Sequence, residues 1–458
     1  MSLSGEYFLR EGGESFWRWD GSGYDVKVVD SLDSDSSACI LVSSYKELRD
    51  SVSNSIQNMN SVETLKDVFD QLIDSVTSEK PAESVSTKIF IPDLQKLKSI
   101  AVFSLGTPDS AKLRFPRTSM IKLASVISSI LPSKSPNSVV DSPVIISVVL
   151  NSNTTTVPLT EIEYFALCEA LLLSKYSDSR FKSTGKDSPK TFPQIQIVMQ
   201  DPRSKLLLES TLECAKSHVR GIVLTRQLVN APPNVATPLA FERVAKELTA
   251  LYSDCLSLKV FEADECEKMN MGSFLAVSQG SALAPRLIHL TYCHPETEVS
   301  SAKCIALIGK GITFDTGGLN LKTGPMSMIE LMKFDCGGAA AIFGAAEVLA
   351  LQKPRGVIVH IISAVCENAI DGNSYRPGDV VAAMNGKTVE IVNTDAEGRM
   401  TLIDAMQYSQ TKCSPSPSVI LDIATLTGGA LVAVGLSYAP ILGNNESLLQ
   451  AVEQSSKL

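Results

Sequence analysis

Continuous runs of apolar and β-branched residues recur through the second half of the chain and constrain its fold more than any other feature. Segments of helical length separate them. Runs that are apolar throughout, rather than alternating with polar residues, are typical of strands buried on both faces by helices. The pattern predicts an α/β domain with a central mixed sheet flanked by helices. The runs are 287–292, 304–309, 356–365, 388–393 and 418–426.

The first two hundred residues also alternate between two kinds of segment. Helix-like stretches occur at 62–76 and 161–173, and the polar stretch 174–190 reads as a surface loop. Strand-like and helix-like segments in alternation predict a smaller N-terminal α/β domain. The strand-like runs are 38–42, 99–103, 144–150 and 194–198.

A length of 458 residues makes two domains the natural expectation. A helical segment is predicted over 211–229, and it ends before the breaker string APPNVATP. We place the boundary near residue 205. Residues 1–205 then form the smaller domain, and residues 206–458 form a larger α/β domain that begins with the connecting helix.

Composition narrows the classes of partner. The 50 acidic residues outnumber the 41 basic ones, which disfavours nucleic acid as the main partner. The N-terminus shows no export signal, and Asp422, Gly428 and Gly429 interrupt the longest apolar stretch, so no membrane span is expected. Ten cysteines without paired spacing indicate reduced thiols in the cytoplasm. With only four histidines, a metal site must rely on carboxylates.

The strand at 304–309 leads into a glycine-rich polar turn that carries Lys310, Asp315 and Lys322. In open α/β sheets, ligands bind beyond the carboxyl ends of the strands. The alternative is an ordinary turn with exposed charges. The segment matches neither the P-loop nor the GxGxxG spacing, so a phosphate site is not expected.

A second acidic position follows in an apolar, glycine- and alanine-rich segment. Ser327 and Glu330 have the spacing of a capping box, which predicts that a helix begins there. Asp335 falls inside that helix, and a buried carboxylate needs a partner or a cation. The small residues 337–339 favour close packing, although Asp335 facing solvent is the alternative.

A third acidic pair follows the β-rich run that ends at Asn393. Alternate side chains of an extended segment share one face, so Asp395 and Glu397 are expected to face one site. Arg399 could neutralise them or hold an anion. The alternative is an ordinary acidic turn.

Together these stretches supply four carboxylates, which exceed the needs of one divalent ion and repel one another. Two ions would offset that repulsion, as in two-metal hydrolases. Zn²⁺, Mn²⁺ and Mg²⁺ suit such ligands. Lys310 can ligate only as a neutral amine, so a nearby cation must lower its pKa.

Other nucleophiles have weaker support. Cys336 and Cys366 lack an evident histidine partner, and no GxSxG motif occurs, so both are expected to be core residues rather than parts of a serine or cysteine peptidase. The pair Cys293–His294 reads as a strand-end feature. His360 lies inside an apolar strand, so we expect a buried histidine whose ring nitrogens have hydrogen-bond partners.

The motifs GKGITFDTGG (309–318), LMKFDCGG (331–338) and above all NTDAEGR (393–399) resemble the leucyl aminopeptidase (cytosol aminopeptidase) family, in particular its plant-like and apicomplexan-like branch. The resemblance covers roughly residues 210–450. It implies a macro-like N-terminal domain, a metallopeptidase catalytic domain and a cytoplasmic homohexamer. Family members usually continue further, so late elements and one wall of the substrate pocket are expected to lie outside this chain.

The resemblance also implies a ligand set for two metals. Lys310, Asp315, Asp335 and Glu397 correspond to the ligands of the more exchangeable site. Asp315, Asp395 and Glu397 correspond to those of the other, so that Asp315 and Glu397 bridge both ions. The implied ions are Zn²⁺, with Mn²⁺, Mg²⁺ or Co²⁺ as alternatives at the exchangeable site.

The implied reaction is removal of an N-terminal residue, preferably leucine or another large apolar one, from a peptide by a metal-bridging hydroxide. Lys322 corresponds to the lysine that polarises the substrate carbonyl. Arg399 corresponds to the arginine that holds a bicarbonate ion as general base. The positions implied around the substrate are Met332, Thr425, Leu426 and Gly428.

Overall fold

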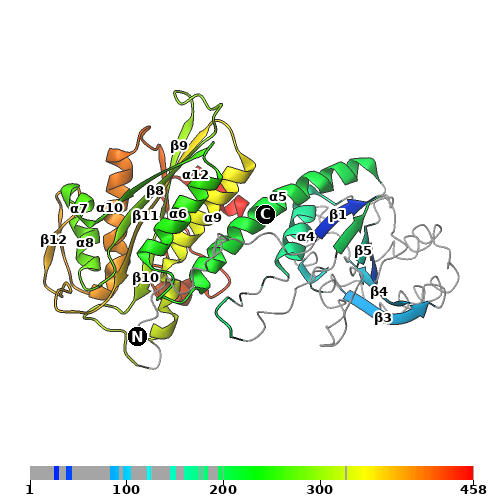
Figure 1. Cartoon of the computed structure of the whole chain (residues 1–458), viewed down its shortest axis with the longest axis horizontal. Coiled ribbons are helices and arrows are strands. Elements are labelled where there is room, and N and C mark those ends of the chain that lie inside the picture. Colours follow the sequence, from blue (N-terminus) through cyan, green and yellow to red (C-terminus); the bar gives the residue numbers. More distant parts are fainter. Residues whose placement is uncertain are drawn as a thin grey trace. The chain divides into compact units, whose positions relative to one another are not determined.

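The computed structural model of the chain (Figure 1) describes most of the residues from 201 onward and selected segments before them. The helix expected at 62–76 and most of the loop expected at 174–190 lie outside the described residues. The described residues are 25–29, 38–43, 83–91, 96–104, 121–123, 125, 145–150, 159–174, 176, 178, 180–183, 194–199, 201–324 and 327–456.

The N-terminal unit contains a six-stranded sheet in the order β1-β6-β5-β2-β4-β3. Only the β3–β4 pair is antiparallel, and the other neighbours are parallel. The four expected strand-like runs coincide with β2, β4, β5 and β6, and the expected helix 161–173 coincides with α4 (Glu161–Leu173). The strands are β1 (Asp25–Val29), β2 (Ala38–Ser43), β3 (Glu83–Ile91), β4 (Lys96–Ser104), β5 (Ile145–Leu150) and β6 (Gln194–Val198).

The C-terminal unit is built on a mixed sheet in the order β14-β9-β11-β8-β7, with β10 also paired to β11. The strands β14, β9, β11 and β10 run parallel, whereas β8 and β7 are antiparallel to their neighbours. This confirms the predicted α/β class with a mixed central sheet. The strands are β7 (Leu256–Phe261), β8 (Arg286–Cys293), β9 (Lys303–Gly309), β10 (Gly311–Asp315), β11 (Val357–Asn368) and β14 (Val419–Ile423).

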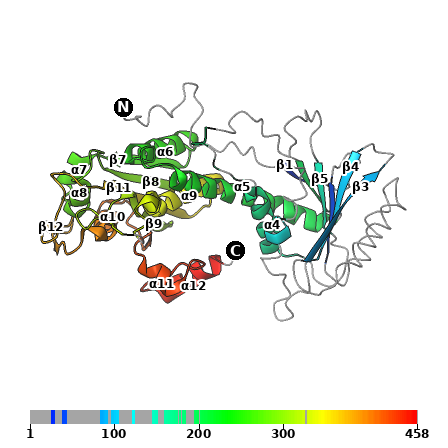
Figure 2. The same ribbon diagram turned by 90° about the horizontal axis from the view of Figure 1, so that it is seen from below.

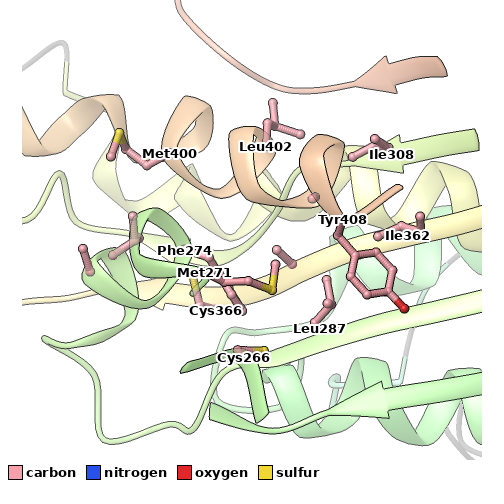
Figure 3. Packing of buried hydrophobic residues seen from close by; sticks show 14 of the residues in the cluster. Cys266, Met271, Phe274, Leu287, Ile308, Ile362, Cys366, Met400, Leu402 and Tyr408 are labelled. Atoms are coloured by element: carbon pink, nitrogen blue, oxygen red, sulfur yellow. The ribbon is translucent and has the colours of Figure 1, made fainter. Parts of the chain in front are cut away.

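Helices flank this sheet (Figure 2). On one side α8 (Gly272–Ser278) and α10 (Glu397–Lys412) pack on each other and on β11. Their core includes Phe274, which lies near Met271 and Cys366, and Tyr408, which lies near Ile362 of the sheet (Figure 3). A second pair of helices, α6 (Pro238–Leu251) and α9 (Gly337–Gln352), also packs on β11. The Phe241 ring contacts the Phe343 ring edge-on, with 5.7 Å between the ring centroids. This unit also contains the short helices α7 (Ala263–Lys268) and α11 (Gly429–Val434), whereas α12 (Glu446–Ser455) groups with the other unit.

A long helix, α5 (Pro202–Asn230), starts nine residues before the helix expected at 211–229. The Asp201 carboxylate accepts the backbone N–H of Ser204 at 2.8 Å, and proline is favoured in a first turn. The chain divides into two compact units inside this helix, between Val219 and Arg220, and residues from Asn445 onward group with the N-terminal unit. A domain boundary near residue 205 stays a prediction.

Two local expectations were wrong. The run 388–393 forms only the short strand β13 (Thr388–Glu390), which pairs antiparallel with β12 (Val380–Ala382) in a largely exposed ribbon. Ser327 does not cap a helix either. Met328, with φ of 46°, precedes the 3₁₀ helix η4 (Ile329–Cys336), and α9 begins only at Gly337.

The segment from Ile329 to Gln352 is long and apolar enough to cross a membrane by composition alone. However, 61% of its most apolar window is buried inside the protein. Core helices of domains that have no membrane contact have the same properties, so this segment is a core element of the C-terminal unit.

Close packing at the start of α9 gives a testable prediction. A Cβ on Gly338 would lie 2.0 Å from the Ile423 carbonyl oxygen and 2.7 Å from the Lys310 nitrogen, so Gly338→Ala must push α9 away from β14 and β9. We expect it to lower the free energy of unfolding by about 2 kcal/mol or more, measured by urea denaturation. A Cβ on Gly372 meets nothing within 4 Å, so Gly372→Ala is the matched control. Equal effects of the two substitutions would contradict this packing.

Candidate metal centre

Three separate stretches of the C-terminal unit bring carboxylates together. Asp315 ends β10, Asp335 lies in η4 and Glu397 is the first residue of α10. One oxygen from each lies within 4.8 Å of the others, and the three residues are at most 2% exposed. Like charges this close repel one another in a poorly solvated place, so cations or retained protons must offset the repulsion.

Lys310 is one of these cations. It lies between β9 and β10 and is only 2% exposed. Its Nζ contacts Asp335 Oδ1 at 2.7 Å and Glu397 Oε1 at 2.8 Å, and it donates to the Thr425 carbonyl oxygen at 3.3 Å. The Lys310 stem runs against the first turn of α10, where a Cβ on Gly398 would lie 2.4 Å from Lys310 Cε. A side chain at position 398 would therefore displace the end of the Lys310 side chain from its two carboxylates.

Lys322 is the second cation. Its Nζ contacts Asp315 Oδ2 at 2.9 Å and also pairs with Asp395 Oδ1. The Asp395 side chain is 34% exposed and does not belong to the three-carboxylate cluster. Each lysine thus bridges two carboxylates.

The expectation of an extended segment at 395–397 was wrong. Residues Thr394–Ala396 form the 3₁₀ turn η5, and α10 starts at Glu397. Asn393 Oδ1 accepts the Asp395 N–H at 2.9 Å, which caps the helix and ends the extended backbone. Asp395 thus pairs with Lys322 from the turn and Glu397 pairs with Lys310 from the start of the helix, rather than both from one face of a strand.

Several buried polar residues that hold the Asp315 region in place were not predicted from the sequence. Asn368, fully buried at the end of β11, donates from Nδ2 to Asp315 Oδ1 at 2.8 Å and to the Thr394 carbonyl at 3.1 Å. The Tyr375 hydroxyl donates to the same carbonyl at 2.7 Å. Thr394 also donates to the Gly317 carbonyl at 2.7 Å. Asn368 could have been found, because it follows the strand-end rule that identified Asp315.

Burial and mutual charge shift the pKa values of these groups. Burial raises the pKa of Glu397 to about 7, against the opposing charge of Lys310, and Asp315 and Asp335 add to the rise. Burial also raises the pKa of Asp335. Burial lowers the pKa of Lys310, but the charges of Glu397 and Asp335 outweigh it, so the net direction is upward. A divalent cation beside Lys310 would act in the opposite direction, as its role as a neutral ligand requires.

Within the buried cluster of Asp315, Asp335 and Glu397, two carboxylate oxygens have no hydrogen-bond partner among the described residues: Asp335 Oδ2 and Glu397 Oε2. Buried carboxylate oxygens without partners are costly, whereas hard and borderline divalent cations favour oxygen ligands. The donor set of Lys310, Asp315, Asp335, Asp395 and Glu397 therefore fits divalent metal ions.

Of the residues expected around the substrate and the bicarbonate ion, Thr425 contacts this centre directly. The Thr425 hydroxyl donates to Asp335 Oδ1 at 2.7 Å. Met332 is half-buried on η4, and Leu426 is 42% exposed. Gly428 precedes α11. Arg399 is exposed on the first turn of α10.

Comparison with known proteins places these residues inside a matched region. Residues 223–458 match the model of the cytosol aminopeptidase family, catalytic domain. Leucine aminopeptidase 1 of Arabidopsis thaliana is 42% identical over 292 residues, which are 64% of this chain and 54% of that protein. A probable cytosol aminopeptidase of Synechococcus sp. (strain CC9605) is 44% identical over 290 residues, 63% of this chain and 56% of that protein. The chain thus spans about half the length of the curated relatives it matches.

A solved structure also matches. A mutant of tomato leucine aminopeptidase superposes with a TM-score of 0.73 and 30% sequence identity. The match covers 96% of this chain and 81% of the tomato chain. Because of this coverage, the likeness includes the N-terminal unit as well as residues 223–458.

The raised pKa of Glu397 predicts how stability depends on pH without metal. Folding favours the protonated carboxyl, so ionisation of Glu397 destabilises the folded protein as the pH rises from about 4.5 to about 7. In a chelator, Glu397→Gln should match the wild type near pH 4.5 and melt at a higher temperature above pH 7. Glu390→Gln, at an exposed residue, is the control. A melting difference that does not change with pH would contradict the shift.

Proposed function

The chain belongs to the cytosol aminopeptidase family, and from that premise we propose that it is a metal-dependent aminopeptidase that removes single residues from peptide N-termini. The observation that carries the proposal is the buried cluster of Asp315, Asp335 and Glu397 with two oxygens left without hydrogen-bond partners. A buried cluster of this kind is unfavourable unless cations neutralise it.

We propose that two divalent ions bind here. Lys310, Asp315, Asp335 and Glu397 would hold the more exchangeable ion, and Asp315, Asp395 and Glu397 the other. Zn²⁺ is the expected ion, with Mn²⁺, Mg²⁺ or Co²⁺ at the exchangeable site. When bound, such ions activate a bridging water as hydroxide and polarise the scissile carbonyl.

The protein's own groups account for the remaining steps. Lys322 would leave Asp315 and Asp395 when metal binds there, and its ammonium would then be available to stabilise negative charge on the substrate carbonyl oxygen. A free α-amine would be required beside the carboxylates of Asp335 and Glu397, which restricts cleavage to the N-terminal residue. Arg399, exposed on the first turn of α10, would hold a bicarbonate ion as general base.

The side-chain preference proposed is leucine or another large apolar residue. Met332 offers a flexible apolar contact, and Leu426 is an exposed apolar residue beside Thr425, which binds Asp335. The backbone around Gly428 would contact the peptide.

We also propose a cytosolic homohexamer. The names of several relatives contain "cytosol", although leucine aminopeptidase 2 of Arabidopsis thaliana is named chloroplastic. Support for an assembly comes from apolar side chains that α11 and the loop after it leave uncovered: Val432 is 89% exposed, Leu436 90% and Leu442 93%. Apolar surface of this kind commonly marks an association site.

Substitution of proposed ligands tests the function. Asp395→Ala and Glu397→Ala should abolish hydrolysis of a leucyl-anilide substrate while the circular dichroism spectrum stays unchanged. Asp264→Ala, at an exposed residue of α7, is the matched control and should keep full activity. A chelator should remove the activity and added Zn²⁺ or Mn²⁺ should restore it. Normal turnover by either ligand variant would refute the assignment.

Lys322→Met separates two roles of the lysine. Loss of a group that stabilises the carbonyl oxygen should lower kcat by about 100-fold or more. Because the same ammonium competes with metal for Asp315 and Asp395, the variant should bind Zn²⁺ at least as tightly as the wild type in calorimetry. Lys387→Met, at an exposed residue, is the control. If metal affinity and kcat fall together, Lys322 supports the metal site instead.

A further inference from the structure

A second cluster of metal-binding side chains lies in the C-terminal unit and contains none of the carboxylates described above. His289 of β8, His360 of β11 and Cys413, directly after α10, place one ligand atom each within 4.8 Å of the others. The three residues are 3%, 1% and 8% exposed. As expected from the sequence, His360 is a buried residue with hydrogen-bond partners, but those partners include a second histidine.

The sheet register holds two of these residues rigidly. His360 pairs directly with Thr291, and His289 lies two residues further along the same antiparallel strand. Alternate residues share a face, so His289, Thr291 and His360 all face the side of the sheet on which α10 packs. The end of α10 then brings Cys413 to this face.

The distances resemble those of a metal site. His289 Nε2 lies 2.9 Å from His360 Nδ1 and 3.8 Å from Cys413 Sγ. Tetrahedral zinc with its usual bond lengths would separate two nitrogens by roughly 3.3 Å and a nitrogen from a sulfur by roughly 3.6 Å. Thr291 Oγ1 lies 3.1 Å and 3.3 Å from the same two nitrogens, close enough to approach a fourth position.

The outer nitrogen of each ring also has a partner that would orient it for metal binding. His360 Nε2 lies 3.0 Å from the Pro415 carbonyl oxygen, and His289 Nδ1 lies 3.0 Å from the Tyr408 hydroxyl. Metal-binding histidines typically donate their second N–H to such oxygens.

We propose that His289, His360 and Cys413 bind a thiophilic transition-metal ion of the Zn²⁺ class, at a structural site separate from the carboxylate centre. Two imidazoles with one thiolate suit such an ion, and a buried position at the junction of β8, β11 and α10 suits a structural role. Bound metal would tie the end of α10, the helix that begins with Glu397, to the central sheet.

The protons balance in a simple way. Without metal, Tyr408 donates to His289 Nδ1, His289 Nε2–H donates to His360 Nδ1, and His360 Nε2–H donates to Pro415. With metal, His289 carries its proton on Nδ1 and donates to the Tyr408 oxygen, while His360 keeps its Nε2–H. Both rings stay neutral, and only the thiol proton of Cys413 is released.

The surroundings agree with this protonation. Burial lowers the pKa of His289 to about 3, so the ring is neutral and able to ligate at neutral pH. Burial raises the pKa of the Cys413 thiol to about 12, so the thiol becomes a thiolate only when metal displaces its proton. The nearby Lys259 charge favours the thiolate and opposes a further positive charge.

Co²⁺ is the probe that distinguishes this site. A thiolate ligand on Co²⁺ gives a near-ultraviolet charge-transfer band, and none of the proposed ligands of the carboxylate centre contains sulfur. We expect the full chain to develop this band at saturating Co²⁺, with an intensity that corresponds to one sulfur-bound ion beside any Co²⁺ at the carboxylate centre, and to lose it when Zn²⁺ is added. Cys413→Ser should remove the band, whereas Cys168→Ser, at a buried cysteine of the other unit, should keep it.

A second variant covers the case in which Cys413→Ser fails to fold. His360→Gln should weaken Co²⁺ binding at the sulfur site by at least about tenfold, with the band still visible at high Co²⁺. Absence of a sulfur band from the wild-type chain at saturating Co²⁺ would overturn the proposal and leave the three residues as a hydrogen-bonded core network. That result would not touch the proposed peptidase function.

Discussion

Mutual repulsion among buried carboxylates is the constraint on which the rest of the C-terminal unit depends. Asp315, Asp335 and Glu397 lie too close together, and too far from water, to be tolerated without positive charge. Lys310 and Lys322 supply part of it, and each lysine holds two carboxylates. Two ammonium groups balance only two of four negative charges, so the site is prepared for cations of higher charge.

Close packing of the surrounding elements holds the carboxylates and lysines together. Gly338 lets α9 approach β14 and the Lys310 backbone, and Gly398 lets the Lys310 stem pass over the first turn of α10. Asn368 fixes the Asp315 carboxylate from the neighbouring strand. The first residue of α10 is Glu397, and Cys413 of the histidine–cysteine cluster directly follows its last residue. One helix therefore connects both sites to the same sheet.

Sequence reasoning predicted the class of fold and the convergence of the three acidic stretches, because apolar runs reveal buried strands and strand ends collect ligands. The sequence-based predictions were wrong where the local backbone conformation determines which element a residue belongs to. Asn393 turns the chain into a 3₁₀ turn and helix, so Asp395 and Glu397 do not share the face of a strand. Met328 with positive φ, rather than Ser327, precedes the 3₁₀ helix that carries Asp335. The partner of His360 was also missed, since pairing of β8 with β11 is set by tertiary structure.

Anomalous X-ray diffraction from crystals of the chain soaked in Mn²⁺ tests the central claim most directly. The account predicts two anomalous peaks, one in contact with Asp335 and the other with Asp395, both touching Asp315 and Glu397, and Lys322 Nζ withdrawn from Asp315. Crystals with no peak among these carboxylates, and with both lysines still bridging them at saturating Mn²⁺, would contradict it.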